Sequence, residues 1–394
     1  SLPMDLFDEV ASAEAPPRSE LSMAPVGGAL DELADLVCQP GIGRVAIIVS
    51  DELTEASPDG PDAAVALAEA LGAPVHGAPL HGTGVFPPTH PLWAGPLAPA
   101  AAAINKTLAA YDRVLLLGGQ AFRVYPYTEG SPLPEHCELL HVSAEPSLLG
   151  RAHTARLGVL GDPAATARAL VPLVRDRIDA AAADAAVEAA RARRDGEIAQ
   201  MEQTALSRYD ASPVEPMAAA HALLRAMPEG SAVVDEAITT GTYVRGFHHH
   251  GTPGRYFFTK GGGLGWGMPA ALGVCLGLDR EPVLSVTGDG AAMYSPQALW
   301  TAAREQLPIV FAVVNNRQYL ILKNNLRGMS GDAVRTGRFV AMDLDTPPVD
   351  FVALARSMGV DGTHVDNAAD IGDAVKAAVA SGKPHLIEIP ISAP

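Results

Sequence analysis

Short apolar runs that alternate with helical patterns constrain the fold of this chain more than any other feature. Residues 45–49 and 309–314 contain only apolar side chains, so each expected strand needs an apolar cover on both faces. Residues 64–71 have a helical pattern. Further mainly apolar runs lie at 113–117, 139–142, 232–234, 282–286 and 385–389. Buried strands separated by helices form parallel sheets covered on both sides, which predicts an α/β protein.

Two changes in composition indicate how the chain is divided. Residues 1–27 are acidic and rich in Ala and Pro, and we interpret them as the end of a preceding domain plus a linker. Residues 176–210 are Ala-rich with interspersed charges, which favours an exposed helical linker. We therefore predict two doubly wound parallel-sheet domains, 28–175 and 211–394, joined by this helical linker.

Charge and cysteine content exclude several classes of function. The formal net charge is -17, so we expect neither a nucleic-acid partner nor association with an anionic membrane. No apolar run is long enough to span a bilayer and no signal peptide is visible, so we expect a cytoplasmic protein. Cys38, Cys137 and Cys275 are far apart and odd in number, which argues against a disulfide framework or a zinc site.

The most informative segment is the apolar strand that ends in Gly288-Asp289-Gly290. Ligands in open α/β sheets bind at the carboxyl ends of strands, so Asp289 is expected to face a ligand. The flanking glycines allow backbone N–H groups to approach a phosphate closely. A helix is expected to follow, with Ser295 as its N-cap and Pro296 in its first turn.

A second strand, 309–314, ends in Asn315-Asn316, and Asn316 follows Asp289 by 316 − 289 = 27 residues. This spacing accommodates one crossover helix, so both strands can end at the same edge of a sheet. A carboxylate, an amide and nearby backbone carbonyls form a set of oxygen ligands. Such a set, with diphosphate oxygens, suits octahedral Mg²⁺.

These two motifs together resemble the signature of the thiamine-diphosphate-dependent decarboxylases, and the chain is most similar to the benzoylformate decarboxylase family. The resemblance extends to 86–91, 122–125 and 295–304. It implies that 28–175 is a central six-stranded sheet domain and that 211–394 is the diphosphate-binding domain. It further implies non-oxidative decarboxylation of a small-molecule 2-oxo acid to an aldehyde, with thiamine diphosphate and Mg²⁺ as cofactors.

The resemblance assigns roles to individual residues. Asp289, Asn316 and the backbone carbonyl of Gln318 would hold Mg²⁺, and Thr239 or Thr240 would contact the diphosphate. The Gly262 carbonyl would accept a hydrogen bond from the exocyclic amine of the aminopyrimidine, and Leu264 would lie beneath the bend between the two rings. The resemblance also implies cofactor contacts at Gly263, Gly288, Gly290, Ala291, Tyr319 and Leu320.

Several positions depart from the family pattern. Tyr125 stands where the family has an active-site histidine, and we interpret it either as a substrate contact or as a packed aromatic side chain. Leu320 replaces a common glycine, Ile238 replaces a residue that usually carries a hydroxyl, and Ala291 replaces a frequent serine. The changes at Tyr125 and Leu320 imply a substrate pocket that differs from one for benzoylformate itself. At Ile238 a cofactor contact is expected to be lost or replaced, and at Ala291 only the backbone N–H can serve.

Residues 1–5 resemble the last strand of the family's N-terminal pyrimidine-binding domain, which carries the glutamate that protonates the aminopyrimidine. We expect that domain as a cleaved or separate chain. Because the active site of the family forms between subunits, we also expect a homotetramer or a hetero-oligomer. The isolated chain is then expected to show no turnover.

Alternative hypotheses remain open on the sequence alone. The same cofactor serves carboligases and synthases such as acetolactate synthase, and a non-catalytic cofactor-binding subunit is a further alternative. The hypothesis of a nicotinamide-dependent oxidoreductase depends on a loose GxGxxA match at 265–270. The residues before it, 257–259, are expected to form only a poor strand, which argues against this hypothesis.

Two further interpretations concern single residues. A metal site at His248-His249-His250 is disfavoured, because adjacent histidines rarely point at one ion. Lys260 is interpreted as a solvated or phosphate-facing charge. The central domain is expected to bind no nucleotide.

Overall fold

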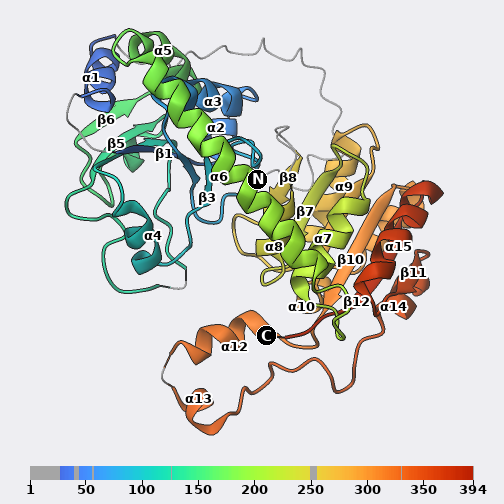
Figure 1. Ribbon diagram of the computed structural model, residues 1–394. Coiled ribbons are helices and arrows are strands. Elements are labelled where there is room, and N and C mark those ends of the chain that lie inside the picture. The colour runs from blue at the N-terminus through green and yellow to red at the C-terminus, as the bar shows by residue number, and fades with distance from the viewer. Residues whose placement is uncertain are drawn as a thin grey trace, which may run out of the picture.

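Each half of the chain forms one six-stranded parallel sheet with helices on both faces (Figure 1). The computed structural model describes residues 27–39, 44–55, 57–125, 127–248, 255–329 and 331–393. These sheets confirm the α/β prediction of two doubly wound units. The predicted domain boundaries, 28–175 and 211–394, enclose one sheet each.

The first sheet has the strand order β3-β2-β1-β4-β5-β6. Its strands are β1 (Val45–Val49), β2 (Val75–Gly77), β3 (Trp93–Pro96), β4 (Arg113–Leu117), β5 (Glu138–Ser143) and β6 (Leu157–Leu160). Its helices are α1 (Gly27–Val37), α2 (Glu52–Glu55), α3 (Gly60–Leu71), α4 (Ala101–Leu108), a 3-10 turn η2 (Pro146–Leu148) and α5 (Pro163–Arg175). Buried apolar side chains form a separate core layer on each face of the sheet, which explains why the strands are apolar throughout.

The second sheet has the strand order β11-β12-β10-β9-β7-β8. Its strands are β7 (Ala232–Glu236), β8 (Tyr256–Phe258), β9 (Val283–Gly288), β10 (Ile309–Asn315), β11 (Asp361–His364) and β12 (His385–Pro390). Its helices are α7 (Pro216–Ala226), α8 (Gly241–Phe247), α9 (Gly267–Gly277), α10 (Asp289–Ala292), α11 (Ala298–Glu305), α12 (Leu320–Arg327), α13 (Asp332–Thr336), α14 (Phe351–Ser357) and α15 (Ala368–Ser381). The chain changes direction across the sheet between β7 and β9, and a crevice for ligands forms at such a point.

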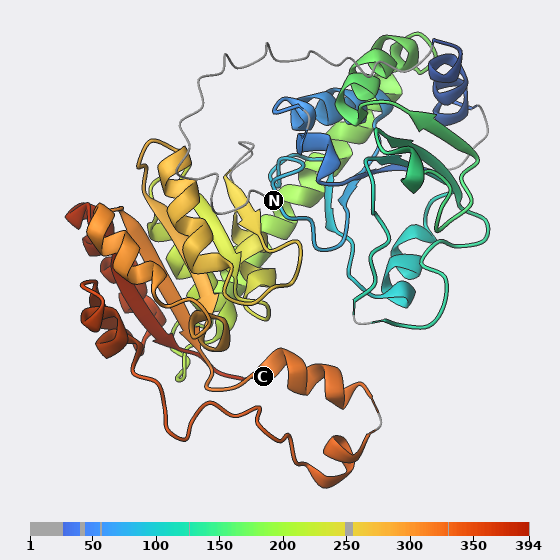
Figure 2. The ribbon, with the colours of Figure 1, turned by 180° about the vertical axis from the view of Figure 1, so that it is seen from behind.

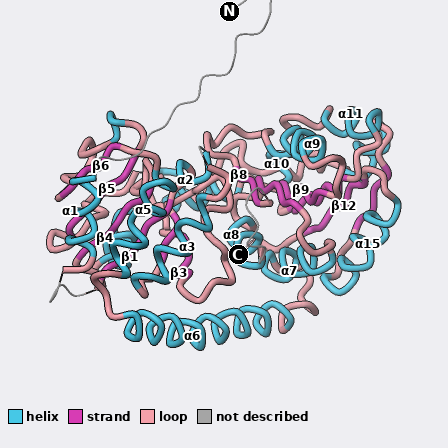
Figure 3. Tube along the Cα trace, turned by 90° about the horizontal axis from the view of Figure 1, so that it is seen from above, coloured by secondary structure: helices cyan, strands magenta, loops and turns pink. Residues whose placement is uncertain are grey.

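Helix α6 (Ala180–Leu206) joins the two units and lies along one side of both (Figures 1 and 3). It begins at Asp179, whose side chain accepts a hydrogen bond from the Ala181 N–H. Only three of its residues, all alanines, are buried. Helix propensity therefore contributes more to this helix than the burial of an apolar face does.

A loop of the first unit extends the edge of the second sheet. Thr83 forms an antiparallel bridge with Phe257, and the Phe258 N–H donates to the Gly82 carbonyl at 2.8 Å. Asp51, after β1, accepts from the Gly82 and Thr83 N–H groups at 2.7 and 3.0 Å. Lys260, interpreted above as a solvated or phosphate-facing charge, is 44% exposed and pairs with Asp51 at 3.4 Å. This lysine is therefore solvated and also joins the two units.

Two local predictions were wrong. The segment at 257–259 was expected to be a poor strand, but β8 pairs with β7 in parallel register, because tertiary pairing outweighs weak local preference. Ser295 does not cap a helix: α11 begins at Ala298, and the Ser295 hydroxyl donates to the carbonyl of Gly265.

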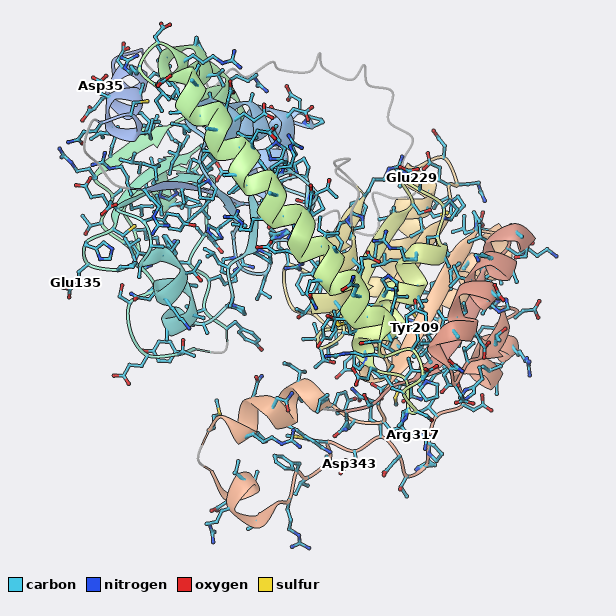
Figure 4. The ribbon with its side chains drawn as sticks, in the orientation of Figure 1. Asp35, Glu135, Tyr209, Glu229, Arg317 and Asp343 are labelled. Atoms are coloured by element: carbon cyan, nitrogen blue, oxygen red, sulfur yellow. The ribbon has the colours of Figure 1, made fainter. Side chains whose placement is uncertain are left out.

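The segment between β10 and α14 forms an arm that extends away from both sheets (Figures 1 and 2). Arg317, near the start of this arm, and Asp343, on its returning side, are labelled in Figure 4. Two contacts join its two sides. The Leu344 N–H donates a hydrogen bond to the Arg317 carbonyl at 2.7 Å, and Gln318 forms an isolated antiparallel β-bridge with Asp343. The buried ammonium of Lys323 also donates to the Gln318 side chain at 2.7 Å. These contacts hold the segment after Asn316 in a defined position.

Candidate functional site

Asp289 lies at the carboxyl edge of the second sheet, next to the point where the strand order reverses. Val314 of β10 is paired with Gly288 of β9, so the residues that follow each strand are neighbours at this edge. The Asp289 carboxylate is 5% exposed and accepts from the Gly290 N–H at 2.9 Å and from the Gln318 N–H at 3.2 Å. Burial raises the pKa of this carboxyl, and the surrounding backbone N–H groups oppose that change.

The two asparagines after β10 have different roles. The Asn315 amide donates to the buried Glu388 at 2.8 Å and its carbonyl accepts from the Arg317 N–H, so Asn315 is a structural anchor. Asn316 is partly exposed, and its side-chain oxygen accepts from the Gln318 N–H at 3.1 Å. Arg317 has a positive φ of 58°, which turns the backbone between the two. Asn316 and Gln318 thus lie beside Asp289, as the spacing indicated.

Glycine is required at 290 because the ring of Tyr319 lies against it. A Cβ atom at Gly290 would come within 2.4 Å of that ring. By contrast, a Cβ atom at Gly288 would meet no atom within 4 Å, so there is open space above the end of β9. Ala291 and Leu320, also implied as cofactor contacts, are buried.

The loop after β7 brings a threonine to the same edge. Ile238 is 37% exposed and Thr239 is partly exposed, whereas Thr240 is completely buried with no hydrogen-bond partner for its hydroxyl. Of the two threonines implied as diphosphate contacts, Thr239 is therefore accessible to a ligand and Thr240 is not. Asp235 fixes the start of this loop, because its carboxylate accepts from the Ala237 N–H at 2.9 Å.

The glycine-rich segment has an exposed tip and a fixed base. Gly261, Gly262 and Gly263 are exposed, and a Cβ atom on any of them would meet no neighbour within 4 Å. Leu264 is 40% exposed at the end of this tip. The following residues, 265–267, donate their N–H groups to the buried carboxylate of Glu236.

Sequence reasoning missed Glu236, although an acidic pair directly after an apolar strand was a signal that was available. The contacts of Glu236 also remove the support for a nicotinamide site. The N–H groups at the start of α9 that would face a dinucleotide diphosphate are already bonded to this carboxylate.

Tyr125 projects from the first unit toward the second. Its side chain is 67% exposed, so it is not a packed aromatic residue. It lines a cavity of about 600 Å³ between the units, together with Ile238, Ile321 and Asn325. Its role as a substrate contact remains a prediction.

A second crevice, of about 490 Å³, lies at the carboxyl edge of the first sheet. Its lining includes the carboxylates of Asp51, Glu52, Glu145 and Asp162 and the cationic side chains of Arg123 and Lys260. The expectation that this unit binds no nucleotide stays a prediction.

The residues at the edge of the second sheet fit a diphosphate held through a divalent cation. Among the described residues, no cationic side chain pairs with the buried Asp289 carboxylate, which a bound cation would neutralise. No group of three or more His, Cys, Asp or Glu side chains in the described ranges is arranged to hold a metal. A metal here would therefore take ligands from Asp289, the Asn316 amide, a backbone carbonyl and the bound molecule itself.

Of the histidine run, His249 and His250 lie outside the described residues. His248 is buried and lines the cavity that also contains Tyr125. The three cysteines are free, as expected. No helix in the described part of the chain is both long and apolar enough to cross a membrane.

Fold and site together define an α/β protein whose residues at a strand-order reversal fit a diphosphate-bearing ligand. Residues 239–389 match the C-terminal TPP binding domain of thiamine pyrophosphate enzymes, and residues 44–170 match their central domain. The chain belongs to the thiamine pyrophosphate enzymes, as its resemblance implied.

Individual relatives have different activities. The chain is 33% identical over 329 residues to a benzoylformate decarboxylase from Pseudomonas aeruginosa, covering 83% of this chain and 57% of that protein. It is 28% identical over 403 residues to a sulfoacetaldehyde acetyltransferase from Castellaniella defragrans, covering 96% of this chain and 65% of that protein. A solved thiamine diphosphate-dependent 4-hydroxybenzoylformate decarboxylase from Rhodococcus jostii RHA1 superposes with a TM-score of 0.78 at 28% identity, covering 97% of this chain and 68% of that one. The chain thus spans less than two thirds of either curated relative.

Proposed function

We propose that this chain binds thiamine diphosphate through Mg²⁺ and takes part in the non-oxidative decarboxylation of a benzoylformate-like 2-oxo acid to an aldehyde. The observation that carries the proposal is the buried Asp289 carboxylate, which no cationic side chain among the described residues pairs with. It lies beside Asn316 and Gln318, at the edge where the strand order reverses between β7 and β9. The similarity to two decarboxylases supports the type of reaction.

The residues of the site have separable tasks in this proposal. Asp289, Asn316 and the Gln318 carbonyl would hold the cation, and Thr239 and the N–H groups near Gly290 would hold the diphosphate. When bound, the cofactor supplies the electron sink that is required to break the bond between the carboxylate and the keto carbon.

The exposed tip of the glycine-rich segment would hold the ring half of the cofactor. The Gly262 carbonyl would accept from the aminopyrimidine, and Leu264 would support the bend between the rings. Tyr125 would face the substrate from the other unit. Its hydroxyl is a hydrogen-bond donor and acceptor that can orient a carboxylate or a keto oxygen.

A carboligase or transferase is the second candidate, and the match to a sulfoacetaldehyde acetyltransferase over 96% of this chain favours it. Both candidates need the same cofactor site. Product analysis with a 2-oxo acid separates them, because a decarboxylase releases an aldehyde and a carboligase releases a carbon–carbon coupled product.

The Asp289→Ala substitution tests the cofactor site directly. We expect a loss of thiamine diphosphate affinity of more than about 100-fold in the presence of Mg²⁺, since even second-shell changes at metal sites cost about 10–100-fold. Isothermal titration calorimetry measures the affinity, and Asp370→Ala, on the exposed face of α15, is the matched control. Unchanged binding by Asp289→Ala, or no binding by the unaltered chain, would contradict the proposal.

A further inference from the structure

One carboxylate holds three consecutive backbone N–H groups at the start of α9. Oε1 of Glu236 accepts from the Gly265 N–H at 2.7 Å and from the Trp266 N–H at 3.1 Å, and Oε2 accepts from the Gly267 N–H at 2.7 Å. Glu236 is 1% exposed. The carboxylate therefore satisfies donors that a helix N-terminus would otherwise leave without partners.

The glycines at 265 and 267 are required for this contact. Gly265 has φ = 89°, and a Cβ atom there would lie 2.5 Å from Ser295 Oγ. A Cβ atom at Gly267 would lie 2.8 Å from the Cβ atom of Glu236. Because the Ser295 hydroxyl also donates to the Gly265 carbonyl, the base of the loop is fixed from two sides.

The tip of the same loop has no such support. Gly261 to Gly263 have open space around them, and Leu264 is 40% exposed. On its C-terminal side, the tip is therefore connected to the fixed residues 265–267. Glu236 pairs with Thr287 in the register of β7 and β9, so this base is anchored directly beside the strand that carries Asp289.

We infer that Glu236 is a positioning residue that sets the place of Gly262 and Leu264 relative to Asp289. The inference rests on the proposed function. It adds that the site has two independently held halves: Glu236 and Ser295 fix the half that would support the rings of the cofactor, and Asp289 with Asn316 fixes the half that would hold its diphosphate.

The Glu236→Gln variant tests the anchor without any ligand. Glutamine retains one acceptor oxygen and places an NH₂ group against an N–H donor, so at least one bond to residues 265–267 is lost. We expect amide hydrogen exchange of 265–267 to accelerate about tenfold or more, because a hydrogen bond to a charged group is lost. Glu52→Gln is the matched control, since Glu52 also accepts from a backbone N–H, that of Ala144, in the other unit.

A comparison of two ligands then separates positioning from a general loss of structure. Inorganic pyrophosphate with Mg²⁺ probes the diphosphate half alone, and thiamine diphosphate with Mg²⁺ probes both halves. For Glu236→Gln we expect affinity for thiamine diphosphate to fall about tenfold or more while affinity for pyrophosphate stays within about twofold. Ser295→Ala, which removes the second tether, should act in the same direction with a smaller effect.

Each outcome decides the inference. Equal losses for both ligands, or no loss for either, would overturn it, as would unchanged exchange at 265–267. An unaltered chain that does not bind thiamine diphosphate would contradict the proposed function instead. Should Glu236→Gln fail to fold by circular dichroism, the Ser295→Ala variant supplies the same two measurements.

Discussion

Asp235 and Glu236 are adjacent on β7, but their side chains lie on opposite faces of the sheet, because direction alternates along a strand. Glu236 holds the glycine-rich loop. Asp235 holds the loop that carries Thr239, and it also accepts from the Tyr256 hydroxyl at 2.9 Å. Two consecutive carboxylates thus fix the two loops of the proposed cofactor site.

The completely buried Asp235 gives a prediction about pH. Burial raises the pKa of its carboxyl from 3.8 to about 6, against the opposing effects of the Ala237 N–H, Arg245 and Tyr256. The Asp235 carboxyl therefore binds its proton more tightly in the native state than in the unfolded state. As pH rises from about 4 to about 6, the loss of this proton lowers the free energy of unfolding. The full effect is on the order of 3 kcal/mol.

Urea denaturation at several pH values measures this effect. The difference between the unaltered chain and Asp235→Asn isolates it, because the other titrating groups are common to both. The unaltered chain should lose stability relative to the variant over that pH range. A difference that does not change with pH would show that Asp235 keeps an ordinary pKa.

At the scale of elements, the edge strand β8 depends on a partner from the other unit. The loop at 82–83 bonds to β8, and Asp51 holds that loop with bonds to the Gly82 N–H, the Thr83 N–H and the Thr83 hydroxyl, the last at 3.1 Å. The glycine-rich loop begins directly after β8. The loop at 82–83 thus connects the first unit to the proposed site in the second unit.

Asp51→Ala should destabilise the protein by about 2–4 kcal/mol, since it leaves three donors without their buried acceptor. Chemical denaturation measures the change in the free energy of unfolding. Asp59→Ala is the control, because Asp59 is largely exposed and pairs only with Arg168 at the surface. A change no larger than that of the control would mean that water replaces Asp51 without cost.

At the scale of the whole molecule, the groups proposed to meet the cofactor rings and the substrate are open to solvent. Leu264 is 40% exposed and Tyr125 is 67% exposed. Closure of an active site expels water and strengthens the electrostatic interactions inside it. We therefore propose that a further domain or a partner subunit covers these residues. The pyrimidine-binding domain, the homotetramer or hetero-oligomer and the cytoplasmic location stay predictions.

A sample that contains only the 40.8 kDa chain is expected to show no turnover of 2-oxo acids. An intact-mass spectrum under denaturing conditions establishes which polypeptides are present. An aldehyde-release assay with a panel of 2-oxo acids, including benzoylformate, then measures activity. Turnover by the single 40.8 kDa species would show that this chain needs no further domain.

Much of the fold could be predicted, because the features that specify it are local. Runs such as 45–49 and 309–314 must be covered on both faces, which requires a parallel sheet with helices. The motifs at Asp289 and Asn316 could be placed side by side because each ends a parallel strand, and strands of this kind end at one edge. The strand at β8 was missed because its pairing with β7 is not encoded locally.

The sequence by itself determined the α/β architecture, the oxygen-rich motif around Asp289 and the cofactor class that it resembles. Only the tertiary structure decided that Glu236 holds N–H groups 29 to 31 residues away, that Ser295 bonds to a loop instead of capping a helix, and that Thr239 is accessible while Thr240 is buried. The physical reason is that strands and turns follow from neighbouring residues. The partner of a buried polar group depends on which distant backbone the fold brings within about 3 Å.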